Sequence, residues 1–252
     1  MINAVMRQLV YDTPPTYEKY GEYREYLRKM SRFSCAYCTI TESENPGATF
    51  NIDHFRPASL FHNLESTCSN LRYACPRCNS YKRQRWISPE EGCIRDCDNC
   101  TSKACKKDVE RFIDVLSEDP SKMLYLCDDD KIYASLGSKP ANYTINYLRL
   151  NRNQLVKLRH VRRFMDSWQK DLQEKKAEAE ARLMEIRTEW DNFTATHSKP
   201  STPQEQNYIE TIDTMYQMLI IHVEQWLDQI GLEVDRLTQL IAYRTGDDSV
   251  IN

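Results

Sequence analysis

The last part of the chain carries apolar side chains at helical spacing. Apolar residues recur at steps of three and four between residues 153 and 193, and the pattern resumes after a break at residues 198–203. Two prolines interrupt the pattern in this break, where Ser201 or Thr202 can cap a second helix. We therefore predict two long helices that form an antiparallel hairpin, roughly 60 Å long at 1.5 Å per residue.

The second predicted helix is more widely apolar than a self-contained hairpin needs. Met218, Ile220, Ile221 and Val223 fall outside a narrow seam. Such extra apolar width needs a further surface to cover it. Either the rest of this chain, a second copy of it or a different protein provides that surface, and we expect residues 153–252 to dock a partner.

Shorter patterns organise the first part of the chain. An amphipathic helix is predicted over residues 17–33, and a β-hairpin over residues 123–126 and 131–134 around a run of three aspartates. The fold class is therefore α+β. The expected divisions are an N-terminal helical arm (1–34), a cysteine-rich core (35–110), a connecting hairpin and extension (111–152) and the helical hairpin (153–252).

Charge and hydropathy narrow the classes of function. The formal net charge of −3 argues against coating nucleic acid by bulk charge, so any contact must be local. Between residues 144 and 170, Asp166 is the single acid among seven Lys and Arg, a strip that either tracks phosphates or is an ordinary solvated helix face. The chain start lacks an apolar signal-peptide region, and no stretch approaches 18 apolar residues. We expect a cytoplasmic protein that does not enter a membrane.

Two C-x-x-C pairs indicate a metal site. Cys35 with Cys38, and Cys75 with Cys78, can together hold one tetrahedral zinc ion. The alternative is four reduced thiols packed in a core. The 36 residues between the pairs exceed what a simple zinc ribbon needs, so we expect this insert to contain further chemistry.

A second cysteine cluster follows the first. Its spacing, C-x3-C-x2-C-x4-C, includes only one C-x-x-C pair. A second zinc ion, reduced thiols or a redox pair, and an iron–sulfur cluster are all open interpretations. The four residues are Cys93, Cys97, Cys100 and Cys105.

The insert contains an Asp53-His54 dipeptide, and Asn79 and Lys82 follow the second C-x-x-C pair. Three ordered segments carry a family resemblance: FNIDHFRP, NLRYA and CPRCNSYK, beginning at residues 50, 70 and 75. Together they resemble the HNH (ββα-metal) endonucleases with an embedded four-cysteine zinc ribbon. The resemblance spans residues 35–86, so it implies a small ββα core carrying this ribbon.

By this resemblance the protein is a phosphodiester hydrolase that cuts DNA, although RNA is not excluded. Asp53 and Asn79 would hold a catalytic Mg²⁺ or Mn²⁺, and His54 would be the general base, since histidine is mostly neutral at cellular pH. Lys82 would meet the phosphate unless it is an ordinary solvated lysine. Asn70 is expected to brace the loop between the two strands.

Asp53 and His54 pose a geometric question, because successive strand residues point to opposite sides. Both can face one site only if the strand ends or bends there, which Pro57 favours. His62 is either a substitute base or a surface histidine. The cations expected to contact nucleic acid are Arg56, Lys82, Arg83, Arg85, Arg159, Arg162 and Arg163.

Three classes of function are compatible with these features. The chain resembles the nuclease subunit of Septu-type or retron-associated anti-phage defence pairs, in which an ATPase partner would dock on the C-terminal helices. No ATP-binding G-x-x-x-x-G-K-[ST] loop is present in this chain. The alternatives are a stand-alone restriction or mobile-element endonuclease and a non-catalytic zinc-ribbon module that binds nucleic acid.

Overall fold

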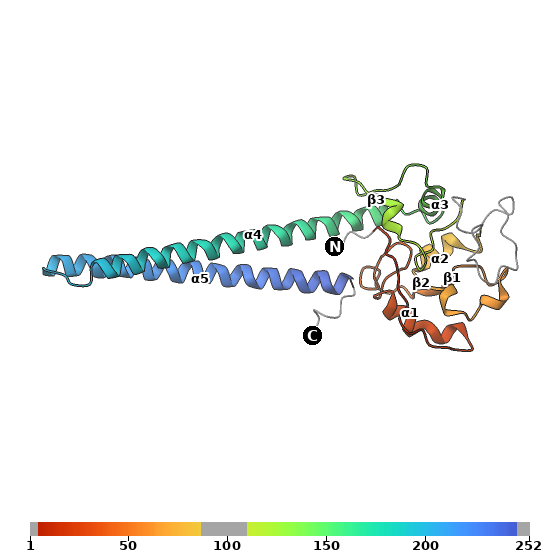
Figure 1. Ribbon diagram of the computed structural model, residues 1–252, viewed down its shortest axis with the longest axis horizontal. Helices are drawn as coiled ribbons and strands as arrows, with labels where there is room; N and C mark the ends of the chain where they lie inside the picture. The colour runs from red at the N-terminus through yellow and green to blue at the C-terminus, as the bar shows by residue number, and fades with distance from the viewer. Residues whose placement is uncertain (1–4, 87–109, 246–252) are drawn as a thin grey trace. The chain divides into compact units, whose positions relative to one another are not determined.

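The computed structural model describes residues 5–86 and 110–245. The chain forms two compact units: Met1–Arg163 with Ala242–Asn252, and Phe164–Ile241. The first unit contains two small antiparallel sheets and short helices, and the second consists of long helices (Figure 1). This confirms the predicted α+β class.

A ββα unit is built around the second C-x-x-C pair: its two strands lie between the pairs in sequence, and its helix contains Cys78. Strand β1 (Asn51–His54) pairs antiparallel with β2 (Leu71–Ala74), and Asp53 lies opposite Arg72 in the register. Helix α2 (Pro76–Lys82) follows β2 directly, because Pro76 suits a first helical turn and the Cys75 side chain caps it by accepting from the Cys78 amide. Helix α2 ends at Lys82, because the next residue, Arg83, has a φ of 52°.

The N-terminal arm is less helical than predicted. A short 3-10 turn (Tyr20–Tyr23) leads into α1 (Arg24–Met30), in place of one helix over residues 17–33. Arg32 and Phe33 take positive φ values of 50° and 52°, so the helix cannot continue through them. Tyr23 and Leu27 are buried in the core, so this segment is still amphipathic, although Tyr20 is exposed.

The loop between β1 and β2 contains two more 3-10 turns, His62–Leu64 and Cys68–Asn70. A further 3-10 turn at Pro120–Lys122 precedes the second sheet, in which β3 (Leu124–Leu126) pairs antiparallel with β4 (Ile132–Ala134). This pair confirms the predicted hairpin. Helix α3 (Lys139–Tyr147) follows, with Ser138 as its N-terminal cap.

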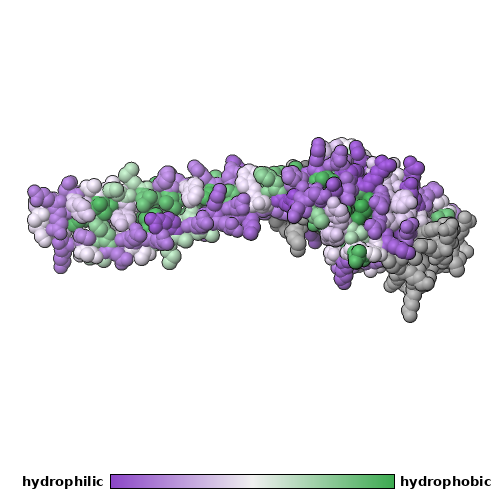
Figure 2. All heavy atoms as spheres, turned by 90° about the horizontal axis from the view of Figure 1, so that it is seen from above, coloured by the Kyte–Doolittle hydropathy of each residue, from purple (hydrophilic) through white to green (hydrophobic). Residues whose placement is uncertain are grey.

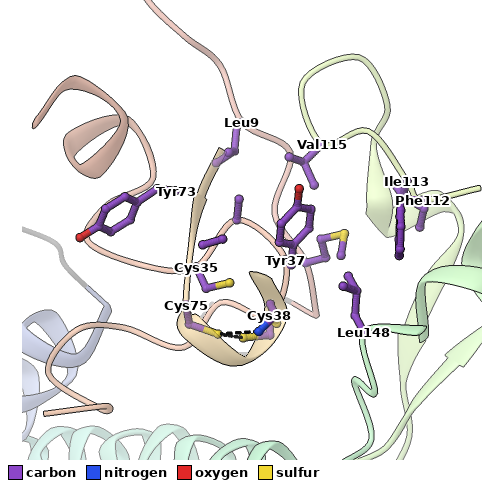
Figure 3. Packing of buried hydrophobic residues seen from close by; sticks show 14 of the residues in the cluster. Leu9, Cys35, Tyr37, Cys38, Tyr73, Cys75, Phe112, Ile113, Val115 and Leu148 are labelled. Atoms are coloured by element: carbon purple, nitrogen blue, oxygen red, sulfur yellow. Dashed lines mark hydrogen bonds between the residues drawn. The ribbon is translucent and has the colours of Figure 1, made fainter. Parts of the chain in front are cut away.

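One apolar core joins these elements. Its fully buried side chains come from α1, the first C-x-x-C turn, the residue before β1, strand β2, the segment before the second sheet and the residue after α3. In that order they are Leu27, Tyr37, Phe50, Leu71, Ile113 and Leu148. Each large side chain contributes about 1.5–3 kcal/mol on burial. Figure 3 shows Cys35, Cys38 and Cys75 in the same neighbourhood as Tyr37 and Leu148. The core therefore encloses the cysteine site.

The predicted helical hairpin is confirmed. Helix α4 (Asn153–Thr196) and helix α5 (Pro203–Thr245) run antiparallel (Figure 1). Side-chain hydrogen bonds between them join Gln169 to Thr238 and Trp190 to Asp213, as the antiparallel arrangement requires. At 1.5 Å per residue the 44-residue α4 is about 66 Å long. Thr202 is the cap, since its hydroxyl accepts from the Glu205 amide at 3.1 Å.

The seam between the helices buries Met165, Ala179 and Ile186 of α4 together with Ile220, Ile230 and Leu237 of α5. Ile220 therefore belongs to the seam and not to the extra apolar width expected from the sequence. Met218 and Ile221 do lie outside it, with 67% and 52% of their surfaces exposed. In the described part of the chain, no helix combines the length and apolar character needed to span a membrane.

Candidate functional site

The two C-x-x-C pairs meet in one buried cluster. The Sγ atoms of Cys35, Cys38, Cys75 and Cys78 all lie within 4.8 Å of one another, and those of Cys38 and Cys75 are 3.7 Å apart. Four sulfurs at about 2.3 Å from a central zinc ion in tetrahedral geometry are separated by about 3.8 Å. Both the identity of the donors and their spacing therefore fit a closed structural zinc site.

The four cysteines of this cluster shift one another's pKa values in opposite directions. Burial raises the pKa of the Cys35 thiol well above its ordinary value, whereas hydrogen bonds from the other three cysteines lower the pKa of Cys75. A zinc ion removes this conflict because it stabilises all four thiolates at once. Among the residues that the structure describes, this is the only group of three or more His, Cys, Asp or Glu placed to share an ion.

Arg152, just before α4, contacts the cluster. Its guanidinium nitrogens lie 3.7 Å from the Cys38 sulfur and 3.9 Å from the Cys78 sulfur. Burial opposes the charge of Arg152, but the neighbouring sulfurs raise its pKa. A cation at this position partly balances the negative charge of a four-thiolate zinc site. Arg152 belongs to the basic strip, and nothing in its sequence context distinguishes it from the other arginines.

His54 is the last residue of β1 and is half-buried. Its Nε2 lies 2.9 Å from the Glu65 carbonyl oxygen, and the Tyr20 ring packs edge-on at 4.9 Å between ring centroids. A carbonyl oxygen only accepts hydrogen bonds, so Nε2 must carry the proton. In the neutral imidazole, Nδ1 then keeps its lone pair. With this tautomer, Nδ1 is the ring nitrogen that can accept a proton.

Asn70 braces the loop that carries Glu65. Its Oδ1 accepts from the Arg56 amide at 2.8 Å, and its Nδ2 donates to the carbonyl oxygens of Arg56 at 3.1 Å and Leu64 at 3.2 Å. Because the Asn70 side chain is buried, these bonds compete little with water. The side chain thereby fixes both ends of the segment that places the Glu65 carbonyl beside His54.

Asp53 and Lys82 lie inside the fold. Asp53 is 5% exposed and Lys82 is fully buried. The Lys82 Nζ is 3.3 Å and 3.2 Å from the two Asp53 carboxylate oxygens and donates to the His54 backbone carbonyl at 2.7 Å. The Tyr37 hydroxyl also donates to Asp53. Burial lowers the pKa of Lys82, against the influence of Asp53.

This arrangement bears on the expected roles of Lys82 and Asp53. A fully buried ammonium group does not reach a phosphate in solution, so Lys82 is not placed for substrate contact. An ammonium group lies against both oxygens of the Asp53 carboxylate, where it would repel a second cation. Asn79, one turn before Lys82 on α2, is half-buried and remains a candidate oxygen ligand.

The cations near α2 differ in exposure. Arg83 is exposed, as is Arg77, which the sequence had not singled out. Arg56 is half-buried over the rings of Phe61 and Trp86. Arg85 packs over the Tyr147 ring at 5.0 Å and donates to the Tyr81 carbonyl at 2.5 Å. Arg83 and Arg77 are therefore the cations in this set that are open to a phosphate.

Three arginines of the basic strip have internal partners. Arg159 donates to the Asp130 carbonyl at 2.7 Å and is buried. Arg162, also buried, pairs with Glu44 and donates to the Thr39 carbonyl at 2.8 Å. Arg163 pairs with Asp130 at 3.0 Å. The expected contact of these residues with nucleic acid is revised, because their guanidinium groups attach the start of α4 to neighbouring loops.

Two sequence expectations concern other positions. Cys93, Cys97, Cys100 and Cys105 lie outside the described residues. His62 is exposed on its 3-10 turn, as expected of a surface histidine. Tyr20 contacts His54 and Tyr37 contacts Asp53, and the sequence assigns neither tyrosine to the site.

Comparison with known proteins identifies the class of this site. Residues 35–85 match the family model for HNH endonuclease, which covers 51 of the 252 residues. No curated protein and no solved structure shows significant similarity to the chain. The chain therefore contains an HNH endonuclease segment with a four-cysteine cluster suited to zinc, and this segment supports a nuclease-type function with a nucleic-acid substrate.

Proposed function

We propose that the protein is an endonuclease that hydrolyses DNA phosphodiester bonds with His54 as the general base. The observation that carries the proposal is the hydrogen bond from His54 Nε2 to the Glu65 carbonyl, within a segment that matches HNH endonucleases. This bond leaves Nδ1 to accept a proton. A positioned base of this kind contributes about 10²–10⁴-fold to rate.

In the proposed reaction, His54 Nδ1 removes a proton from the water whose oxygen attacks the phosphorus atom. One P–O ester bond breaks, and the leaving sugar oxygen takes a proton from solvent water. The imidazolium that forms keeps its Nε2–H bond to the Glu65 carbonyl, whose partial negative charge stabilises it. The Tyr20 ring limits rotation of the imidazole. Arg77 and Arg83, both exposed, are placed to attract the phosphate backbone.

We further propose that cutting requires Mg²⁺ or Mn²⁺, with Asn79 as one oxygen ligand. Such an ion supplies charge neutralisation at the phosphate. The four-cysteine zinc site has a different role in this proposal: it fixes the start of α2 and the first C-x-x-C turn next to β1. Zinc would stabilise the scaffold, and the second ion would serve the reaction.

A nicking assay tests the proposal. Purified wild type should convert supercoiled plasmid to nicked circles with Mg²⁺ or Mn²⁺ and not with EDTA, and His54→Ala should lose at least about 100-fold in rate. His62→Ala is the matched control, because His62 is an exposed histidine in the following loop. A single-stranded RNA substrate in parallel distinguishes DNA from RNA specificity. Equal cutting by wild type and His54→Ala would contradict the assigned base.

The long helices support a second element of the proposal, a protein partner. Large apolar side chains of α5 remain exposed on this unit, including Met215, Met218, Ile221, Trp226 and Leu232. Figure 2 shows apolar patches, in green, on the surface of the helical unit. We propose that this face docks a protein, and the resemblance to anti-phage defence pairs suggests an ATPase encoded by a neighbouring gene.

Co-expression with the neighbouring gene product tests this docking. Met218→Lys with Ile221→Lys should abolish co-purification, whereas Gln206→Lys, at an exposed polar position near the start of the same helix, should not. Robust plasmid cutting by the chain alone, with no partner retained by wild type, would favour the stand-alone endonuclease. Absence of cutting under all conditions, with nucleic acid still bound, would favour the non-catalytic zinc-ribbon module.

A further inference from the structure

We propose that Asp53 is a positioning residue for His54, at the centre of a buried Tyr37–Asp53–Lys82 network that connects the cysteine site to the catalytic base. The proposal rests on the proposed function of His54 as a base. It differs from the role that the HNH resemblance implies, because it removes Asp53 from the ligands of the catalytic ion.

The two hydrogen-bond donors of the network come from the two segments that carry the C-x-x-C pairs. Tyr37 lies inside the first pair, between Cys35 and Cys38, and is fully buried. Lys82 ends α2, four residues after Cys78, and is also fully buried. Both side chains converge on the Asp53 carboxylate. Two separate contacts therefore join Asp53 to the segments that carry the cysteine site.

The contacts of Asp53 satisfy its charge without a further cation. Lys82 Nζ lies within 3.3 Å of both carboxylate oxygens, and the Tyr37 hydroxyl donates to one of them. Because the Tyr37 side chain is fully buried, water does not compete for this hydrogen bond. A buried carboxylate with these partners is satisfied in the way that folded proteins require.

Lys82 extends the network to the base. The same Nζ donates to the His54 backbone carbonyl at 2.7 Å, and the next amide, that of Phe55, donates to the Asn70 carbonyl at 2.8 Å. The backbone on both sides of the His54–Phe55 peptide is thus held. The imidazole projects from this fixed position to the Glu65 carbonyl. Asp53 acts by keeping Lys82 in place.

This arrangement also answers the geometric question of two adjacent residues in one strand. Asp53 is buried on one side of β1, whereas His54 is half-buried and contacts Tyr20 and Glu65. Because successive side chains of a strand point to opposite faces, Asp53 can support the backbone from inside the fold while His54 takes part in the reaction. The two residues need not face the same ion to serve the same reaction.

A double-mutant cycle distinguishes the two roles of Asp53. Asp53→Asn leaves the Lys82 ammonium buried without its counter-ion. Lys82→Met likewise leaves the Asp53 carboxylate buried without its counter-ion. Each single variant should reduce the nicking rate about 10–100-fold, which is the usual loss when a residue that orients a reacting group is replaced. The double variant removes both charges together, so it should recover to within a few-fold of wild type.

The Mg²⁺ dependence of nicking is the second readout. The concentration that gives half-maximal rate should stay the same in the double variant as in wild type. A double variant as inactive as Asp53→Asn, or a half-maximal concentration raised tenfold or more, would show that Asp53 is an ion ligand and overturn the proposal. Full activity of Asp53→Asn would overturn it as well.

Two further measurements separate folding from chemistry. Zinc content and thermal unfolding of each variant show whether the scaffold is intact. If the single variants fail to fold, Tyr37→Phe removes one donor and should lower the rate without changing the Mg²⁺ dependence. If wild type does not cut nucleic acid, the proposed function fails, but non-additive shifts in Tm across the same cycle still test the network on its own.

Discussion

The cysteine site and the end of β1 are two predicted metal sites with different outcomes. The four sulfurs converge within 4.8 Å of one another, whereas the Asp53 carboxylate contacts an ammonium group and a hydroxyl. A C-x-x-C turn fixes the direction of both side chains locally, so its spacing predicts a site. A single acidic residue in a strand has no such constraint, and its partners decide whether it faces an ion or the interior.

Removing a zinc ligand should have the largest effect and sharpen this comparison. Cys75→Ser should lose bound zinc and cooperative unfolding of the first unit, because structural zinc sites contribute about 10–16 kcal/mol of apparent binding free energy to folding. Zinc quantitation and circular dichroism measure both effects.

Cys127→Ser is the control for zinc loss, since Cys127 lies outside the cluster and is partly exposed. A zinc-free Cys75→Ser protein that unfolds at the wild-type temperature would show that the ion has no structural role. The cluster would then be four thiols packed in a core.

A smaller effect is expected at Asn79. If this side chain is an oxygen ligand of the catalytic ion, Asn79→Ala should raise the Mg²⁺ concentration for half-maximal nicking by about 10-fold or more while zinc content stays unchanged. Ser80→Ala, at the exposed next position of α2, is the matched control. An unchanged Mg²⁺ dependence would place the ion elsewhere.

The smallest expected effect is at Arg152. Arg152→Leu removes the guanidinium group beside the Cys38 and Cys78 sulfurs, so the protein should release zinc about 10-fold faster to a chelator. Release followed with a zinc-sensitive dye measures the rate, and Arg149→Leu serves as a nearby control. Zinc release by Arg152→Leu at the wild-type rate would show that the guanidinium group of Arg152 does not stabilise the four-sulfur site.

Much of the fold could be predicted because its signals are local. The apolar spacing of α4 and α5, the C-x-x-C pairs and the turn residues between β3 and β4 each act over a few residues. The burial of Lys82, Arg159 and Arg162 could not be predicted in this way. Their partners, Asp53, Asp130 and Glu44, lie about 29 to 118 positions away, so only the assembled fold brings them together.

The candidate site follows the same division. Asp53, His54, Asn70 and Asn79 were indicated by family resemblance, which gives residue identity but not the direction of each side chain. The contacts that orient His54 come from the Tyr20 ring and a backbone carbonyl at Glu65. A backbone carbonyl has no sequence signature, because every residue carries one.

The central claim is that His54 accepts the proton of the attacking water. The most direct measurement is plasmid nicking by His54→Gly with and without added imidazole, in the presence of Mg²⁺. The account predicts a rate at least about 100-fold below wild type that rises in proportion to imidazole concentration, because the free base enters the space left by the ring. Wild-type cutting by His54→Gly without imidazole would contradict the claim.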